Sequence, residues 1–231
     1  MRLDYFLAHS TGLSRKEVKQ RIGRGAVVVE GEPRPRANTR LTPGQGVWLE
    51  GEPVQLPGHR YLMLYKPAGV VCSTGDPDHR TVLDLLPGDQ RAGLHAAGRL
   101  DLDTTGLVLL TSDGQWSHRL TAPGKRCAKR YRVDCADPVS EADLKLLRDG
   151  VQLRGEPRPT LPAGAEQLGE RRLRLTLYEG RYHQVKRMLA ALGNKVVGLH
   201  REQIGDIVLD ASLAPGQYRP LTDHEVASIG E

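Results

Sequence analysis

The sequence is poor in cysteine, in aromatic residues and in long apolar runs. Its three cysteines, Cys72, Cys127 and Cys135, form no CxxC pair, so neither a disulfide framework nor a zinc site is indicated. Aromatic residues make up 4% of the chain, which argues against a base-stacking sheet of the RRM type. No apolar run approaches the ~20 residues that a membrane span requires, and the N-terminus lacks the apolar core of a signal peptide. These absences predict a cytoplasmic protein with no membrane partner.

Positive charge is concentrated at the start of the chain. Residues 1–40 hold nine of the 33 Arg and Lys residues but only four of the 28 Asp and Glu residues, which leaves the other 191 residues neutral. A basic segment attached to a neutral body favours a binding module for an anionic polymer over a surface that happens to be cationic. The candidate nucleic-acid contacts of this segment are Arg2, Arg15, Lys16, Lys19 and Arg24.

The first 58 residues predict a small separate domain. The spacing of Leu3, Phe6 and Leu7 predicts a short helix, and "SRKE" at residues 14–17 is a capping box that begins a second one. "AVVVEGEP" and "GQGVWLEG" indicate short strands, and the proline- and glycine-rich residues 51–59 indicate a linker. We therefore expect two domains, residues 1–58 and residues 59–231.

After residue 60, strand-like segments outnumber helical ones. "YLMLYKPAGVVCS", "GLVLLTS", "KRYRVDC", "RRLRLTLYEG" and "NKVVGLHR" indicate strands, whereas "SEADLKLLRDG" and "GRYHQVKRMLAALG" indicate helices. Because strands and helices do not alternate strictly, we predict an α+β domain with a mixed sheet, not a doubly wound parallel sheet.

Two carboxylates, Asp101 and Asp103, lie in "GRLDLDTTGL", just before a wholly apolar run. They have three interpretations: a turn stabilised by side-chain hydrogen bonds to the backbone, a divalent metal site, or a single working carboxylate held ionised by a cation. The metal site is the weakest, because alternate residues of a strand point to opposite faces and no further ligand cluster lies nearby. Arg99, or a cation among residues 181–187, could supply the positive charge.

The segment "EGRYHQVKRM", residues 179–188, is basic and begins a helix. Its cations Arg181, His183, Lys186 and Arg187 could bind an anion at the helix N-terminus. The alternative is a solvated cationic face, which is what most Lys and Arg runs are.

The segment "GKRCAKRYRV", residues 124–133, holds five cations, among them Lys129 and Arg130, around Tyr131. A basic groove with one aromatic residue would suit an RNA backbone and one stacked base. Equally, Tyr131 could be an ordinary strand residue with its hydroxyl in water.

These motifs resemble those of a known family. "GRLDLDTTGLVLLTSDG" is similar to the characteristic motif of the RsuA family of pseudouridine synthases, in the branch that modifies ribosomal RNA, and the first forty-odd residues resemble its S4 RNA-binding domain. "KPAG", "KRYRV" and "EGRYHQVKRM" match further motifs in order, and "CSTGDPDH", "GVQL" and "LAPGQYRPLT" extend the resemblance over essentially the whole chain. Many relatives have Asn where Tyr65 precedes "KPAG", a position outside the chemistry assigned below.

The resemblance implies a fold, a reaction and a partner. The expected catalytic domain has a mixed, largely antiparallel sheet flanked by helices. The expected activity is isomerisation of uridine to pseudouridine at position 516 of 16S ribosomal RNA, in a partly assembled small subunit, by a monomer. The alternatives are another ribosomal RNA site, in the large subunit, or a non-catalytic S4-headed assembly factor. A metal-dependent nuclease or glycosyltransferase that uses "DLD" would instead lose its activity in EDTA.

The resemblance also implies roles for individual residues. Asp101 is the expected catalytic carboxylate, Lys186 its ion-pair partner and Tyr131 the residue that stacks on the target base. Leu199 and Arg99 are expected in the pocket, and Asp103 in a supporting role. The reaction involves neither redox chemistry nor phosphoryl transfer, so no cofactor and no metal are expected. Asp101 would attack C1′ of the ribose or remove a proton from C2′, and the sequence leaves both routes open.

Overall fold

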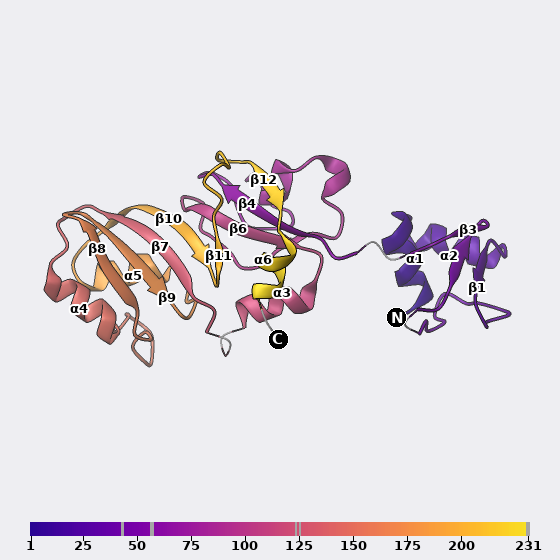
Figure 1. Cartoon of the computed structure of the whole chain (residues 1–231), viewed down its shortest axis with the longest axis horizontal. Helices are drawn as coiled ribbons and strands as arrows, with labels where there is room; N and C mark the ends of the chain where they lie inside the picture. The colour runs from indigo at the N-terminus through magenta and orange to yellow at the C-terminus, as the bar shows by residue number, and fades with distance from the viewer. Residues whose placement is uncertain (43, 56–57, 123, 125, 230–231) are drawn as a thin grey trace. The chain divides into compact units, whose positions relative to one another are not determined.

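The chain folds as two compact units, an N-terminal unit of residues 1–59 and a C-terminal unit of residues 60–231 (Figure 1). This computed structural model describes residues 1–42, 44–55, 58–122, 124 and 126–229. Each unit has its own core of buried apolar side chains. Within these described ranges, no helix combines the length and the apolar character that crossing a membrane requires.

The N-terminal unit packs two helices against a small antiparallel sheet. Its elements are α1 (Leu3–Thr11), α2 (Arg15–Gly23), β1 (Val27–Val29), β2 (Val47–Leu49) and β3 (Glu52–Pro53), with strand order β1-β2-β3. The predicted capping box is confirmed, because Ser14 Oγ accepts from the Glu17 N–H and the Glu17 carboxylate accepts from the Ser14 N–H at 2.8 Å. Leu7 and Val18 are buried in the core beneath both helices.

The predicted linker, residues 51–59, is wrong at its start. Glu52 and Pro53 form β3 and pair with β2, and Val54 packs against the core of the N-terminal unit. The linker was predicted from its proline and glycine content, but these residues also occur in edge strands. Residues 56–57 of the predicted linker lie outside the described residues.

The C-terminal unit is built on one nine-stranded sheet. Its elements are β4 (Tyr61–Lys66), the 3₁₀ helices η1 (Val82–Leu85) and η2 (Gly88–Gln90), β5 (His95–Ala96), β6 (Thr105–Thr111), α3 (Gly114–Thr121), β7 (Lys129–Cys135), α4 (Glu141–Asp149), β8 (Gly164–Gly169), β9 (Arg172–Leu177), α5 (Gln184–Ala191), β10 (Val196–Ile204), β11 (Ile207–Val208), β12 (Tyr218–Pro220) and α6 (Asp223–Ser228). The strand order is β12-β4-β6-β10-β7-β9-β8, with β5 on β6 and β11 on β10. The pairing of β6 with β10 is parallel and the other described pairings are antiparallel, so the predicted mixed, largely antiparallel sheet is confirmed.

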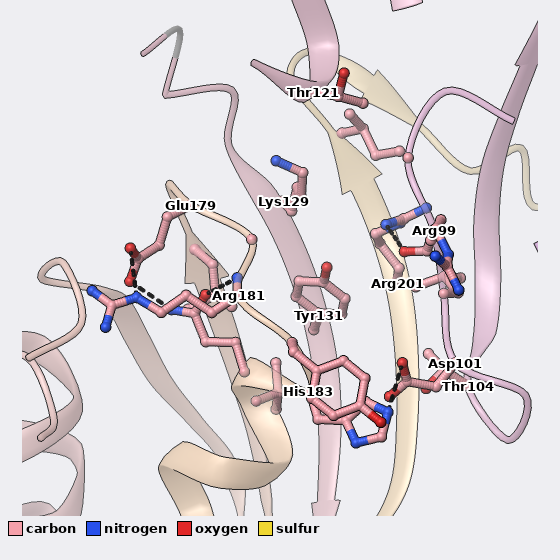
Figure 2. A pocket seen from close by; sticks show the side chains of 18 of the residues that line it. Arg99, Asp101, Thr104, Thr121, Lys129, Tyr131, Glu179, Arg181, His183 and Arg201 are labelled. Atoms are coloured by element: carbon pink, nitrogen blue, oxygen red, sulfur yellow. Dashed lines mark hydrogen bonds and ion pairs between the residues drawn. The ribbon is translucent and has the colours of Figure 1, made fainter. Parts of the chain in front are cut away.

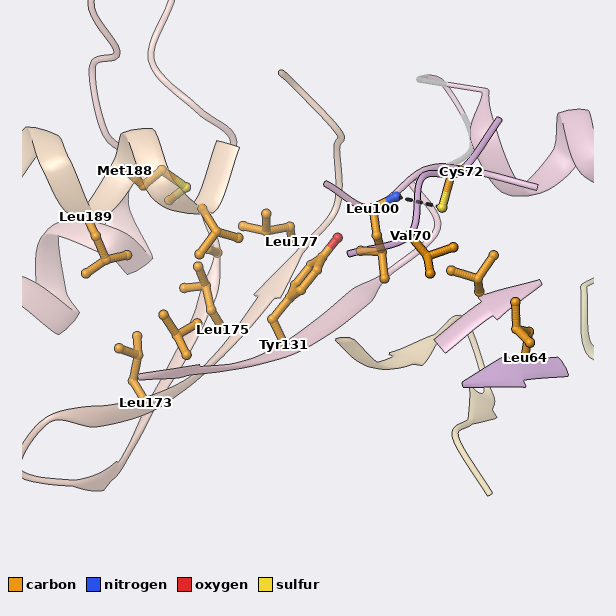
Figure 3. Packing of buried hydrophobic residues seen from close by; sticks show 14 of the residues in the cluster. Leu64, Val70, Cys72, Leu100, Tyr131, Leu173, Leu175, Leu177, Met188 and Leu189 are labelled. Atoms are coloured by element: carbon orange, nitrogen blue, oxygen red, sulfur yellow. Dashed lines mark hydrogen bonds between the residues drawn. The ribbon is translucent and has the colours of Figure 1, made fainter. Parts of the chain in front are cut away.

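Strand β6 is continuously apolar because both faces of the sheet are covered there. Val108 and Leu110 contribute to one core, with helix α5, and Leu107 and Leu109 to another, with helix α3. All four side chains are fully buried. The first of these cores continues along the sheet beneath α5, as Figure 3 shows for Leu175, Met188 and their neighbours.

Strands β6 and β10 approach each other so closely that one position of β6 requires a glycine. Gly106 has a φ of +107°, and a Cβ there would lie 2.3 Å from the carbonyl oxygen of Arg201. The close approach lets Thr105 pair with His200, residues that are nearly a hundred positions apart in the sequence. The loop just before β6, which carries the two aspartates, is thereby fixed beside β10.

Candidate active site

A cavity of about 950 Å³ opens in the C-terminal unit where five segments meet (Figure 2). We call residues 97–104, which form one wall, the carboxylate loop. The other walls come from α3, β7, β10 and the segment that leads from β9 into α5. The sequence-predicted residues that line this cavity are Arg99, Asp101, Lys129, Tyr131, Arg181, His183, Lys186 and Leu199.

Lys186 binds both aspartates of the carboxylate loop. Its Nζ lies 3.1 Å from Asp101 Oδ2 and donates to the two oxygens of Asp103 at 2.7 and 2.9 Å. Burial lowers the pKa of Lys186, but its bonds to the two carboxylates more than offset this, and the pKa lies above its ordinary value. The hydrogen bond from Lys186 lowers the pKa of Asp103. The ammonium group of Lys186 therefore lies between two carboxylates. It is closer to Asp103, which the sequence analysis had given only a supporting role, than to Asp101.

His183 is the second side chain that contacts Asp101. Its Nε2 lies 3.4 Å from Asp101 Oδ1, and Figure 2 shows the two side chains facing each other from separate segments. His183 precedes α5 with a φ of 48°, in the left-handed region, which turns its ring toward the cavity. It was expected to contact RNA, and the structure brings it against the carboxylate instead.

The carboxylate loop distinguishes the interpretations of "DLD". The Asp101 side chain faces Lys186 and His183, and the turn closes through the backbone, with the Thr104 N–H donating to the Asp101 carbonyl at 3.1 Å. The aspartates do not point to opposite faces of a strand, as expected above, because residues 101–103 form a turn. Among the described residues, no three His, Cys, Asp or Glu side chains gather as they would around a metal ion. The Asp101 carboxylate is contacted by one lysine and one histidine.

Lys66, in the "KPAG" motif, is a component of the site to which sequence reasoning gave no role. It is fully buried, and its Nζ donates to the carbonyl oxygens of Thr104 at 2.7 Å, Pro67 at 3.0 Å and Leu102 at 3.3 Å. Burial lowers the pKa of Lys66, opposed by the negative groups of the carboxylate loop. Lys66 thus fixes the backbone on either side of Asp103. The signal in the sequence is a lysine at the end of an apolar strand.

Arg201 is a second buried cation that the sequence did not reveal. Its Nε donates to the Leu107 carbonyl at 2.8 Å and its Nη1 to the Arg99 carbonyl at 3.3 Å, as seen beside the cavity in Figure 2. Its Nη2 is buried with no hydrogen-bond partner among the described residues. Arg201 ties the start of the carboxylate loop to the sheet.

Tyr131 is a buried wall of the cavity. Its side chain is 8% exposed and belongs to the core that contains Leu100 and Leu177, as Figure 3 shows. Tyr131 is therefore both a residue of strand β7 and part of the cavity wall. Leu199 packs against the same core from β10, where it pairs with Val133 of β7.

The predicted basic residues around the cavity are not equivalent. Arg181 bonds Glu179 and the carbonyls of Arg158 and Pro159. Arg187 bonds Glu156 in the same way. These two guanidinium groups anchor the segment around residues 154–159.

The two predicted basic residues beside Tyr131, Lys129 and Arg130, also lie in different surroundings. Lys129 is half-buried, lines the cavity and donates to the Cys127 carbonyl at 3.2 Å, and burial lowers its pKa. Arg130 lies on the opposite face of β7, 3.9 Å from Glu202, because neighbouring strand residues alternate. Lys125 lies outside the described residues.

Four basic residues in and just after helix α2 are exposed, whereas Arg21 of the helix lies 3.6 Å from Glu50. Arg15, Lys16, Lys19 and Arg24 have no ion-pair partner within the described part of the chain. Arg2 differs, because its guanidinium bonds both oxygens of the buried Asp4 at 2.9 and 3.0 Å.

Comparison with known proteins places these features in a family. Residues 60–191 match the family described as RNA pseudouridylate synthase, and residues 1–47 match the S4 domain. The chain is 53% identical over 231 residues to the ribosomal small subunit pseudouridine synthase A of Yersinia pestis, covering 100% of this chain and 98% of that protein. It is 53% identical over 230 residues to the protein of the same name from Escherichia coli K12, covering 99% and 100%. A crystal structure of a pseudouridylate synthase, 48% identical, matches with a TM-score of 0.74 over 100% of both chains. The chain therefore belongs to the RNA pseudouridylate synthase family and carries an S4 domain at its N-terminus.

Proposed function

We propose that the protein isomerises one uridine of 16S ribosomal RNA, at position 516, to pseudouridine, with Asp101 as the catalytic carboxylate. The observation that carries the proposal is the cavity of about 950 Å³, in which Asp101 stands 3.1 Å from Lys186. A cavity of this size suits a nucleotide that has been turned out of its stack. The names of the relatives at 53% identity supply the RNA class.

The proposed reaction exchanges one bond of the ribose for another. Asp101 attacks C1′ or removes the C2′ proton, and the bond between C1′ and N1 breaks with its electron pair leaving on uracil. The uracil turns and C5 bonds to C1′, while Asp101 is released from C1′ or, in the other route, returns its proton to C2′. The C5 proton is then lost to water while N1 gains one. No electron acceptor is needed, since substrate and product are isomers.

The residues around Asp101 have distinct proposed tasks. Lys186 places a positive charge 3.1 Å from the Asp101 carboxylate and orients it toward the cavity. Tyr131 and Leu199 form the apolar wall for the uracil, and Arg99 and Lys129 add positive charge to the cavity. Stacking of the base on Tyr131 offsets part of the cost of extruding it.

The N-terminal unit is the proposed source of RNA affinity. Its exposed cations Arg15, Lys16, Lys19 and Arg24 are free to neutralise phosphates. We propose that the enzyme acts as a monomer, in the cytoplasm, on a partly assembled small subunit.

The test is tritium release from ribosomal RNA labelled at uridine C5 and taken from cells that lack the enzyme. Naked 16S RNA and small-subunit particles are assayed separately in EDTA, and pseudouridine is mapped by primer extension. We expect release by the wild type and none by Asp101→Asn, at one small-subunit site. Substantial release by Asp101→Asn would overturn the assignment of the carboxylate. Mapping to the large subunit would overturn the substrate, and tight binding without release would favour an assembly factor.

A further inference from the structure

Tyr182 is unusually exposed for an aromatic residue. Its side chain is 77% exposed, more than that of any other large apolar residue that the structure describes. It also lines the cavity that contains Asp101. An aromatic ring that faces water beside a nucleotide-sized cavity has no packing role to explain it, and neither the proposed reaction nor the family motifs assigned it one.

The Tyr182 ring is held in place on one side only. It stacks on His183 with a centroid separation of 3.8 Å and an interplanar angle of 19°. His183 is fixed in turn by its left-handed backbone and by its 3.4 Å contact with Asp101. Arg187 clamps the Tyr182 carbonyl at 3.2 Å and is itself held by Glu156 at 3.0 Å. The outer face of the ring is thus presented to solvent by a fixed support, and little conformational freedom remains to be lost on binding.

The position of the ring suits a base that neighbours the target. Tyr182 stacks on the face of His183, and the edge of the same imidazole contacts the carboxylate at which the ribose of the target uridine must lie. Turning that uridine out of its stack deprives the adjacent base of a stacking partner. Unpaired bases in RNA are commonly recognised by stacking on aromatic side chains. The cations around the cavity, Lys186 and Lys129 among them, favour a nucleic acid over an apolar protein partner.

We propose that the outer face of Tyr182 is a second subsite, which stacks on the nucleobase adjacent to the target uridine in an unpaired stretch of RNA. This inference rests on the proposed function of the same cavity. It assigns to Tyr182 a part in substrate positioning, and to His183 the support of the stacking ring in addition to its contact with Asp101.

The test uses 2-aminopurine, whose fluorescence is quenched when it stacks. Fragments of 16S RNA carry the probe on the 5′ or the 3′ side of the target uridine and are saturated with full-length enzyme. We expect quenching on one side with the wild type and with Tyr182→Phe, and its loss with Tyr182→Leu, which keeps an apolar side chain without the aromatic face. The dissociation constant of Tyr182→Leu is expected to rise about 5- to 150-fold, the range for one stacked base.

Two controls separate this subsite from the rest of the proposal. Tyr5 in α1 also stacks on a histidine, His9, at 3.8 Å and 25°, so Tyr5→Leu removes a matched ring and should leave the quenching intact. Asp101→Asn should keep the quenching and lose tritium release. Quenching that persists in Tyr182→Leu, or is absent on both sides with the wild type, overturns the subsite and leaves Asp101 untouched. Release by Asp101→Asn would instead overturn the catalytic assignment. A Tyr182→Leu variant whose binding to RNA is normal but whose binding to ribosomal protein is lost would show that the ring serves a protein partner.

Discussion

The two units of the chain use positive charge in opposite ways. In the N-terminal unit, Arg15, Lys16, Lys19 and Arg24 are exposed and have no ion pair among the described residues, whereas Arg21 of the same helix lies 3.6 Å from Glu50. In the C-terminal unit, three cations that hold the site are bonded: Lys66 and Arg201 to backbone carbonyls, and Lys186 to two carboxylates. Exposed charges attract a polyanion at a distance, whereas bonded charges fix geometry. Affinity and chemistry should therefore be separable by mutation.

The largest effect is expected from removing the bonded cation at the carboxylates. Lys186→Met leaves Asp101 without its ammonium partner, so the charge and the contact that position the carboxylate at the reacting centre are lost. We expect the single-turnover rate of tritium release to fall roughly 10²- to 10³-fold, the usual cost of deleting one charged or hydrogen-bonding partner at a reacting centre. The RNA dissociation constant should change little, as a filter-binding titration would show.

Asp103→Asn is the matched control for Lys186. This variant removes the carboxylate closer to Lys186 and leaves Lys186 paired with Asp101 alone. Because the Asp103 side chain is 70% exposed, we expect a change of only a few-fold in rate. A loss as large as that of Lys186→Met would mean that the distinction between the two aspartates is unfounded.

A smaller effect is expected from the exposed cations. Changing Arg15, Lys16, Lys19 and Arg24 together to Gln should weaken RNA binding roughly 100-fold near 0.1 M salt. The slope of log K against log salt should lose about 3 units of its magnitude. The rate at saturating enzyme should be unchanged.

Two cations of α4 provide the comparison in the C-terminal unit. Lys145 and Arg148 are ion-paired, to Asp149 at 2.7 Å and to Glu141 at 2.6 Å. Their double replacement by Gln should leave the dissociation constant and the salt slope as they are. If this pair lowered the slope as much as the α2 residues, the division of labour between the units would be refuted.

The third effect concerns stability, which the C-terminal unit takes in part from charge. Arg219 bonds Glu225 at 2.8 Å and Asp210 at 2.7 Å and so attaches α6 to the sheet. The bond to Arg219 lowers the pKa of Glu225 from 4.5 to about 2. The contribution of the ionised Glu225 carboxylate to the free energy of unfolding is therefore complete above about pH 4.5 and is lost as the pH falls toward 2.

Glu225→Gln should lower the free energy of unfolding of this unit by about 2 kcal/mol at pH 7 and remove part of its acid dependence. Urea denaturation at pH 7, 5 and 3 measures both quantities. Glu166→Gln, in an ion pair whose carboxylate is 63% exposed, should change stability by less than about 0.5 kcal/mol. Equal effects of the two variants would show that the ion pair between Arg219 and Glu225 stabilises this unit no more than an exposed ion pair does.

The smallest effect is expected in the N-terminal unit. Ser14→Ala removes the side-chain cap of α2 and should destabilise this unit by about 1 kcal/mol. Hydrogen exchange should quicken at α2 amides and not in β6. Faster exchange in β6 would mean that the two units do not unfold independently.

Local patterns in the sequence predicted what local physics decides. The capping box at Ser14, the strand in the apolar run of β6 and the helix in "GRYHQVKRMLAALG" were predicted from neighbouring residues alone, and the structure contains all three. Composition alone misled at Glu52 and Pro53, because a short edge strand and a linker have similar residues. The burial of Arg201 has no local signal in the sequence, and that of Lys66 has only its place at the end of an apolar strand, because Lys and Arg are usually exposed.

The sequence by itself determined the α+β architecture, the basic N-terminal segment and the motif that contains Asp101, because each depends on neighbours in the chain. Only the tertiary structure decided which cation meets which carboxylate. Lys186 reaches Asp101 and Asp103 because the parallel pairing of β6 with β10, at a glycine that admits no Cβ, brings segments eighty residues apart to one cavity. Ion pairs and stacking rings depend on distances of a few ångströms between remote segments, and no pattern along the chain encodes those distances.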